Sequence, residues 1–236
     1  MTTASKLERQ ALLIDADDTL WENNIYFERA IAGFISFLNH QEYSPLEVRQ
    51  VLNQVERENL ERHGYGLHSF AHALVGTFER LSRESLTPAL HRSIDGFAHT
   101  IAEQPIEIIA GVTETLDYLQ PRHRLFLLTK GNVTEQTGKV ERSGLRKFFQ
   151  AVEVVPEKDA KTYRAMVEKH NLAPETSWMV GNSPKSDINP ALKAGLHAVF
   201  VPHADTWVLE HEEIAAATPP QRLLLTQRFS DLALHF

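Results

Sequence analysis

The chain has no cysteine among its 236 residues. Disulfide bonds, thiolate metal sites and a cysteine nucleophile are therefore excluded. It also lacks an apolar run long enough to span a bilayer, and its first ten residues lack the apolar stretch of a secretory signal. We expect a cytoplasmic protein that does not use a membrane as a partner.

Positive charge is also scarce, with 24 Lys and Arg against 31 Asp and Glu and a net charge of -7. This balance argues against nucleic acid or an anionic membrane as the principal partner. An anionic substrate would have to be attracted by local cations instead of by the overall field. Nothing in the composition indicates an oligomeric state.

The apolar pattern divides the chain into two parts. Between residues 21 and 106, apolar residues recur at helical spacing, as in Phe27, Ile31 and Phe34. The segment beginning at Ser44, with Glu47 three residues later, is typical of a capping box that opens a helix. We expect four helices here, covering about 27–38, 45–55, 70–81 and 88–102.

From residue 107 onward, short apolar runs alternate with helical stretches. The expected strands are 125–129, 152–155, 178–180 and 198–201, and the expected helices lie near 113–119, 134–142, 162–170 and 188–194. Residues 12–14 supply one more strand. This alternation predicts an α/β fold, a Rossmann-like parallel sheet with right-handed crossovers. We therefore expect an α/β core from residues 1–20 and 107–236, with an all-α domain inserted at 21–106.

Carboxylates cluster directly after the first expected strand, in the sequence Asp15-Ala16-Asp17-Asp18-Thr19. Open parallel sheets bind ligands at the carboxyl ends of their strands. Residues i and i+2 of an extended chain point to the same side, so Asp15 and Asp17 can share one site. Close carboxylates repel unless a cation lies between them. The segment indicates a metal site, although a solvated acidic turn would show the same residues.

Two later strands also end at polar residues. Thr129-Lys130-Gly131 follows the strand at 125–129, where a hydroxyl and backbone N–H groups can hold a phosphate. Lys158 or Lys161, after the next strand, can neutralise a nucleophile and a transferred group. Each of these segments also fits an ordinary turn or a solvated helix start.

The strand at 178–180 leads into Gly181-Asn182, with Asp187 five residues after Asn182. Carboxylate and amide oxygens are the ligands that Mg²⁺ prefers. The order of all four segments resembles the four motifs of the haloacid dehalogenase-like hydrolase (HAD) superfamily. The resemblance covers nearly the whole chain, and it identifies the insertion at 21–106 as an α-helical C1 cap.

The resemblance implies roles for individual residues. Asp15 would be the nucleophile and Asp17 the general acid and base, with Thr129 and Lys158 completing the catalytic set. Lys158 is favoured over Lys161 because members of this type place a Glu-Lys pair first.

The resemblance also implies a magnesium ion, held by Asp15, Asp17 through its main-chain carbonyl, and Asn182 or Asp187. Asn182 departs from the family pattern because an acid usually follows this glycine, which leaves open whether Asn182 or Asp187 is the direct ligand. Asp18 departs too, at a position where many relatives have Gly or Asn.

Substrate contacts are expected from Thr19, Lys130 and Gly131 in the core. In the cap, His63 and Tyr65 lie in a glycine-broken stretch between two helices, which can read the leaving group or be an ordinary loop.

The implied activity is Mg²⁺-dependent hydrolysis of a small phosphorylated metabolite through an aspartyl-phosphate. Haloacid dehalogenases resemble this pattern but lack the second aspartate, so Asp17 favours a phosphatase. A phosphonate hydrolase would need a cap lysine, and residues 21–105 contain none. A phospho-accepting signalling module, or a catalytically weak binding protein with the same core, is the alternative.

Overall fold

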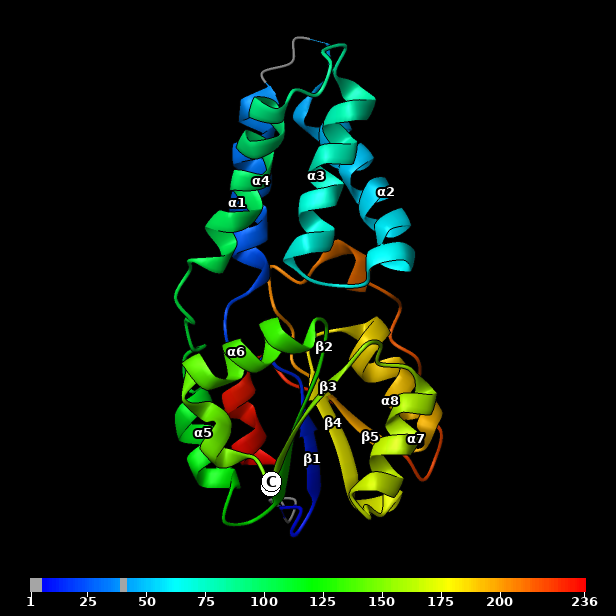
Figure 1. Cartoon of the computed structure of the whole chain (residues 1–236). Helices are drawn as coiled ribbons and strands as arrows, with labels where there is room; N and C mark the ends of the chain where they lie inside the picture. The colour runs from blue at the N-terminus through cyan, green and yellow to red at the C-terminus, as the bar shows by residue number, and fades with distance from the viewer. Residues whose placement is uncertain (1–5, 39–41) are drawn as a thin grey trace. The chain divides into compact units, whose positions relative to one another are not determined.

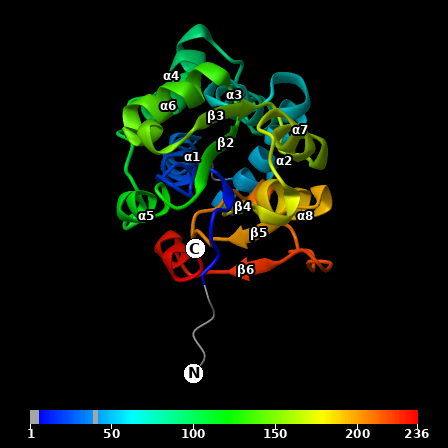
Figure 2. The same cartoon turned by 90° about the horizontal axis from the view of Figure 1, so that it is seen from below.

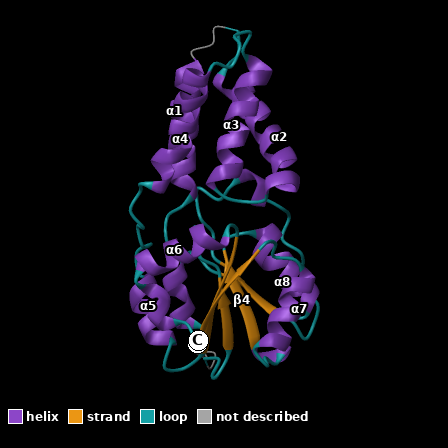
Figure 3. Cartoon of the chain, viewed as in Figure 1, coloured by secondary structure: helices purple, strands orange, loops and turns teal. Residues whose placement is uncertain are grey.

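The computed structural model describes residues 6–38 and 42–236. The chain forms two units, one made of Met1–Glu22 and Ile106–Phe236 and the other of Asn23–Pro105. We call them the α/β unit and the helical unit, because every strand belongs to the first, whereas the regular elements in the described part of the second are helices (Figure 3). The domain boundaries expected from the sequence fall within two residues of these limits.

The α/β unit is built on one six-stranded sheet with the strand order β3-β2-β1-β4-β5-β6. The strands are β1 (Ala11–Ile14), β2 (Arg124–Lys130), β3 (Ala151–Val155), β4 (Ser177–Gly181), β5 (His197–Phe200) and β6 (Leu223–Leu225). Every neighbouring pair is parallel, which confirms the predicted sheet. The edge strand β6 was not predicted, and its three leucines become a strand by pairing with β5.

Helices cover both faces of this sheet. They are α5 (Val112–Leu119), α6 (Val133–Ser143), α7 (Ala160–Lys169) and α8 (Asn189–Ala194), close to the four predicted ranges. Helices α5 and α6 lie on one face and α7 and α8 on the other (Figures 1 and 2). Alternate residues of β1 divide between two apolar clusters, with Leu12 and Ile14 facing one side and Leu13 the other. Both faces of β1 are therefore buried, which places the residues after Ile14 inside the unit.

The helical unit contains the four predicted helices, α1 (Asn24–Leu38), α2 (Pro45–His63), α3 (Leu67–Leu81) and α4 (Pro88–Ala102), and α2 continues eight residues beyond its expected end. Its helices share one apolar cluster, which includes Phe34 and Leu74. The predicted capping box is present, since Glu47 N donates to Ser44 Oγ at 3.3 Å and Ser44 N donates to the Glu47 carboxylate at 2.7 Å. None of the helices in the described ranges has the length and apolar character needed to cross a membrane.

Candidate active site

The carboxyl ends of β1, β2 and β4 bring the motif residues together. Ile14, the last residue of β1, pairs with Leu127 of β2 and Val180 of β4. The Asp15 N–H extends this pairing by donating to the Val180 carbonyl at 2.9 Å. Asp15 is therefore fixed beside the turn that begins at Gly181.

Lys158 lies between two buried carboxylates. Its Nζ donates to Asp15 Oδ1 and, at 2.8 Å, to Asp187 Oδ1. Lys158 is 3% exposed, Asp15 7% and Asp187 1%, whereas Lys161 is exposed in the first turn of α7. The geometry thus brings Lys158 and not Lys161 to Asp15. Two carboxylates share one ammonium group, which leaves an excess negative charge.

Burial governs the ionisation of this cluster. Loss of hydration raises the pKa of Asp15 to about 7, opposed by Lys158 and reinforced by the charges of Asp187 and Asp17. Burial lowers the pKa of Lys158, but Asp15 and Asp187 outweigh it and hold that pKa above its usual value. Lys158 is therefore a permanent cation, and Asp15 is a carboxylate whose charge is costly without further compensation.

Asp187 is positioned by a tight turn. Residues Pro184–Ile188 form a π-helical turn, a feature often found at functional sites. The Ser183 N–H donates to Asp187 Oδ2 at 3.0 Å. A Cβ atom on Gly181 would lie only 2.2 Å from this same oxygen, so glycine is required where the chain passes the carboxylate.

Asn182 directs its amide oxygen toward Asp15. Thr19 Oγ1 lies 3.0 Å from Asp15 Oδ2 and 3.3 Å from Asn182 Oδ1, so one hydroxyl can donate to either oxygen. The amide nitrogen of Asn182 points the other way and donates to Thr206 Oγ1 at 2.9 Å. Thr19 and Asn182 are both buried, and the Thr19 hydroxyl lies between the two oxygens with one proton to donate.

Asp17 is held on the α6 side of the site. Lys139 Nζ donates to both of its oxygens at 2.9 and 3.0 Å, Gln136 Nε2 at 2.9 Å and Trp21 Nε1 at 2.8 Å. Burial alone would raise the pKa of Asp17, but Lys139 and the two other donors hold it below its ordinary value. Asp17 is therefore an anion in this arrangement.

The segment after β2 contributes structure around these groups. Thr129 is buried near the end of β2. Lys130 does not point into open space: its Nζ donates to Ser186 Oγ and to Glu210 Oε1, each at 2.6 Å. Glu210, which follows β5, also accepts from Ser183 Oγ at 2.6 Å and thereby ties Lys130 to the turn that carries Asp187. Gly131 has a φ of 138°, a conformation that favours glycine.

The two predicted cap residues lie in the helical unit. His63 is the last residue of α2, and Tyr65 lies in the connection to α3. Their contact with substrate stays a prediction.

Oxygen donors at the site suit a hard divalent cation. Asp15 Oδ2 and Asn182 Oδ1 both lie within hydrogen-bond distance of the Thr19 hydroxyl. Asp187 is linked to the other oxygen of Asp15 by Lys158, which donates to both carboxylates. Their combined charge with Lys158 is negative, and carboxylate and amide oxygens are typical Mg²⁺ ligands. These residues therefore fit the metal ion that the resemblance implies.

A second group of potential ligands lies next to the site. Asp18, Glu22 and His203 place three ligand atoms within 4.8 Å of one another. His203 is already engaged on both ring nitrogens, by the Asp205 N–H at 3.2 Å and by Glu22 Oε2 at 3.1 Å. We interpret this group as a hydrogen-bonded support for the loop after β1.

The α/β unit also has a cavity of about 680 Å³ at the opposite edge of the sheet. Its lining includes Gln10, Trp178 and His197, which lie at the amino ends of the strands. It is thus separate from the cluster around Asp15.

Several residues of the site could not be identified from the sequence. Lys139 and Gln136 lie one turn apart on α6, and a lysine on a helix face has no feature that distinguishes it from a solvated one. Glu210 lies in a segment without a recognisable motif. The apolar-to-polar change at each strand end pointed to Asp15, to Asp187 and to one of the two lysines, Lys158 or Lys161, but not to Lys139, Gln136 or Glu210.

Comparison with known proteins agrees with this geometry. A family model described as haloacid dehalogenase-like hydrolase matches residues 10–195. No curated protein sequence matches. A haloacid dehalogenase-like family hydrolase from Xanthomonas campestris is 30% identical, with a TM-score of 0.82 over 100% of this chain and 97% of that one.

Two other similar structures differ in their described activities. A predicted phosphoglycolate phosphatase from Haemophilus somnus 129PT is 17% identical, with a TM-score of 0.63 over 96% of this chain and 97% of its own. A 2-haloacid dehalogenase from Pseudomonas syringae pv. Tomato DC3000 is 18% identical, with a TM-score of 0.58 over 95% and 96%. At identities of 17% and 18%, both structures show a similarity of fold alone to this chain. The family match over most of the chain is the decisive finding: the protein belongs to the haloacid dehalogenase-like hydrolase family.

Proposed function

We propose that the protein is a Mg²⁺-dependent phosphomonoester hydrolase that acts on a small phosphorylated metabolite through an aspartyl-phosphate. The observation that supports this choice most is the second carboxylate, Asp17, close enough to Asp15 for its charge to raise the pKa of Asp15. Displacement of a halide from carbon needs no proton donor. The alkoxide that leaves a phosphate ester does, and a carboxyl group is a suitable donor.

In the first step, a carboxylate oxygen of Asp15 attacks phosphorus and the bond to the leaving oxygen breaks, with its electron pair staying on that oxygen. Asp17 gives a proton to the leaving oxygen. In the second step, Asp17 takes a proton from water, the water oxygen attacks phosphorus, and phosphate leaves while Asp15 is restored. Each residue ends in its starting state.

Neighbouring residues prepare these steps. Lys158 orients Asp15 through their hydrogen bond and opposes the growth of negative charge. Lys139, Gln136 and Trp21 hold Asp17 as the base that the second step needs. The first step therefore requires Asp17 to be released from Lys139 so that it can carry a proton. Mg²⁺, held by Asp15, the main-chain carbonyl of Asp17 and either Asn182 or Asp187, would polarise the phosphoryl oxygens.

A paired assay tests the proposal. The purified protein is given a panel of sugar phosphates, nucleotides and phosphorylated short-chain acids, and in parallel a panel of 2-haloacids, each with Mg²⁺ and with a chelator. We expect phosphate release that depends on Mg²⁺, lost in Asp15→Asn and Lys158→Met and kept in Lys161→Met. Halide release that persists in the chelator, with no phosphate from any ester, would show a dehalogenase instead. A stable acyl-phosphate formed from acetyl phosphate without turnover would favour the signalling alternative.

A further inference from the structure

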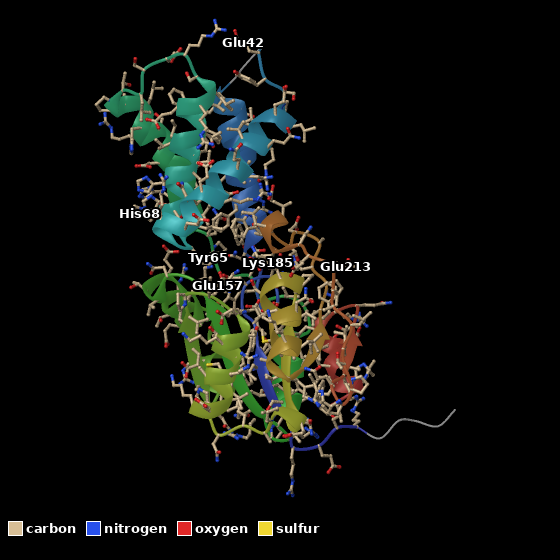
Figure 4. The ribbon with its side chains drawn as sticks, turned by 90° about the vertical axis from the view of Figure 1, so that its right-hand side faces the viewer. Glu42, Tyr65, His68, Glu157, Lys185 and Glu213 are labelled. Atoms are coloured by element: carbon tan, nitrogen blue, oxygen red, sulfur yellow. The ribbon has the colours of Figure 1, made fainter. Side chains whose placement is uncertain are left out.

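Three imidazole rings gather at the junction of α2 and α3 in the helical unit. His63 ends α2, and His68 and His72 lie one turn apart on α3. The ring centroid of His72 is 4.7 Å from that of His63 and 4.5 Å from that of His68. All three residues are exposed, and Figure 4 shows His68 at the beginning of α3.

We propose that His63, His68 and His72 form a binding site for a borderline divalent transition metal, with Zn²⁺ as the representative ion. Histidines four residues apart on a helix present their rings on one face, an arrangement that binds zinc in other proteins. Imidazole nitrogen is a preferred ligand of Zn²⁺, Ni²⁺ and Cu²⁺. His63 adds a third ring from a separate helix, which makes the set tridentate.

The rings are stacked in the structure, with interplanar angles of 11° for His63 and His72 and 27° for His68 and His72. In this arrangement their nitrogens do not converge. Exposed side chains change rotamer on the picosecond to nanosecond scale, so rotation about χ1 and χ2 is accessible to all three. His72 lies within 5 Å of each of the other two rings, and the centroids of His63 and His68 are 6.1 Å apart. At these separations one ion, about 2.0–2.1 Å from each nitrogen, can bridge the rings after rotation.

Several titratable groups act on His72 within the cluster. Partial burial and the neighbouring rings of His68 and His63 lower the pKa of His72, while Asp95 on α4 opposes this shift and His91 adds to it. The Asp95 carboxylate, which lies 3.3 Å from His91 Nδ1, is thus an acidic group whose charge acts on His72.

The donor atoms distinguish this site from the one around Asp15. The α/β unit offers carboxylate and amide oxygens, which suit Mg²⁺, whereas the histidine cluster offers nitrogen alone. Zinc binding at the histidine cluster is therefore independent of whether the protein hydrolyses phosphate esters.

Direct metal titration tests the proposal on the full chain, prepared without a polyhistidine tag. Zn²⁺ is titrated by calorimetry in the presence of excess Mg²⁺, into the wild type, the double variant His68→Ala/His72→Ala, and the matched control His99→Ala. His99 is an exposed histidine of α4 whose Nδ1 lies 2.9 Å from the Asp95 carbonyl oxygen, outside the cluster. We expect the double variant to lose one Zn²⁺ binding event, or at least about tenfold in Zn²⁺ affinity, since loss of an outer-shell partner of a metal ligand alone costs that much. The His99→Ala control should bind Zn²⁺ as the wild type does.

Spectroscopy identifies the ligands. With Cu²⁺ in place of Zn²⁺, electron paramagnetic resonance should show nitrogen hyperfine coupling in the wild type and in His99→Ala, and lose it in the double variant. Circular dichroism checks that every variant is folded, which is expected because all three substituted side chains are exposed. Identical Zn²⁺ isotherms for the wild type and the double variant, or no binding by either, would overturn the proposal.

Discussion

Replacing Asp15 by asparagine should abolish hydrolysis and at the same time stabilise the folded protein. The reason is the charge balance of the buried cluster, in which Asp15 and Asp187 share Lys158. The asparagine amide is neutral and nearly the same size as the carboxyl group. It leaves Lys158 paired one to one with Asp187.

The pKa of Asp15 sets the magnitude. Burial raises it from 3.8 to about 7, so between pH 4 and pH 7 the folded protein keeps a proton that the unfolded chain releases. The free energy of unfolding of the wild type therefore falls as pH rises through this window. At about 1.4 kcal/mol per pKa unit, the full rise corresponds to about 4 kcal/mol as an upper limit. Because the substitution also weakens the bond to Lys158, we expect Asp15→Asn to gain about 1–3 kcal/mol at pH 8.

Urea unfolding at pH 5 and pH 8, with a chelator present, measures this difference. The gain of Asp15→Asn should be large at pH 8 and small at pH 5, where Asp15 of the wild type is largely protonated. Lys158→Met should lose about 3–5 kcal/mol at pH 8, because two buried carboxylates remain without a cation. Lys161→Met, an exposed control, should change stability by less than about 0.5 kcal/mol. An Asp15→Asn variant that is less stable than the wild type at pH 8, or whose gain does not depend on pH, would refute the reasoning.

Four further outcomes follow from the site. Asp17→Asn should lower kcat by about 10²–10⁴-fold for alkyl phosphates. The loss should be smaller for p-nitrophenyl phosphate, because its leaving group needs little protonation. Equal losses for both substrates in steady-state assays would contradict the role of Asp17 as general acid. Asn182→Asp should lower the Mg²⁺ concentration for half-maximal activity if Asn182 is a direct ligand, and an unchanged Mg²⁺ titration would assign that place to Asp187. Gly181→Ala should cost about 1–3 kcal/mol in chemical denaturation, because its Cβ would clash with Asp187 Oδ2. The pH below which kcat/KM falls should lie under about 7, the pKa of Asp15 without metal, because Asp15 must be ionised to attack and a bound cation favours the ionised form; a fall whose position does not move between low and saturating Mg²⁺ would contradict this.

The sequence predicted most of the fold because each element carried its own local signal. The run before Asp15 is apolar at every position, as expected for a strand buried on both faces, and β1 is buried throughout. Ser44 and Glu47 marked the start of α2 by a mechanism that involves only neighbouring residues. Strand β6 lacked such a signal, since its three leucines become a strand only by pairing with β5.

Some residues of the candidate site also carried a local sequence signal, and others did not. Asp15 and Asp187 were predicted because each follows a strand whose carboxyl end lies at one edge of the sheet. The same reasoning left Lys158 and Lys161 open, and the resemblance to the family favoured Lys158. The partners of Asp17 were not predicted, because Lys139 and Gln136 reach it across more than a hundred residues of sequence. The sequence places Asp15 and Asp17 in one site but does not predict how the pKa of each is shifted. That shift depends on Lys158 for Asp15 and on Lys139 for Asp17.

Covalent labelling of Asp15 tests the central claim most directly. The protein is mixed with a turned-over phosphomonoester and Mg²⁺ in water enriched in ¹⁸O, quenched in acid during the first turnover, and digested for peptide mass spectrometry. The account predicts a phosphoryl group on Asp15 and, after completed turnover, ¹⁸O in the released phosphate. Heavy oxygen in the Asp15 carboxylate, or a phosphoryl group on any other residue, would contradict it.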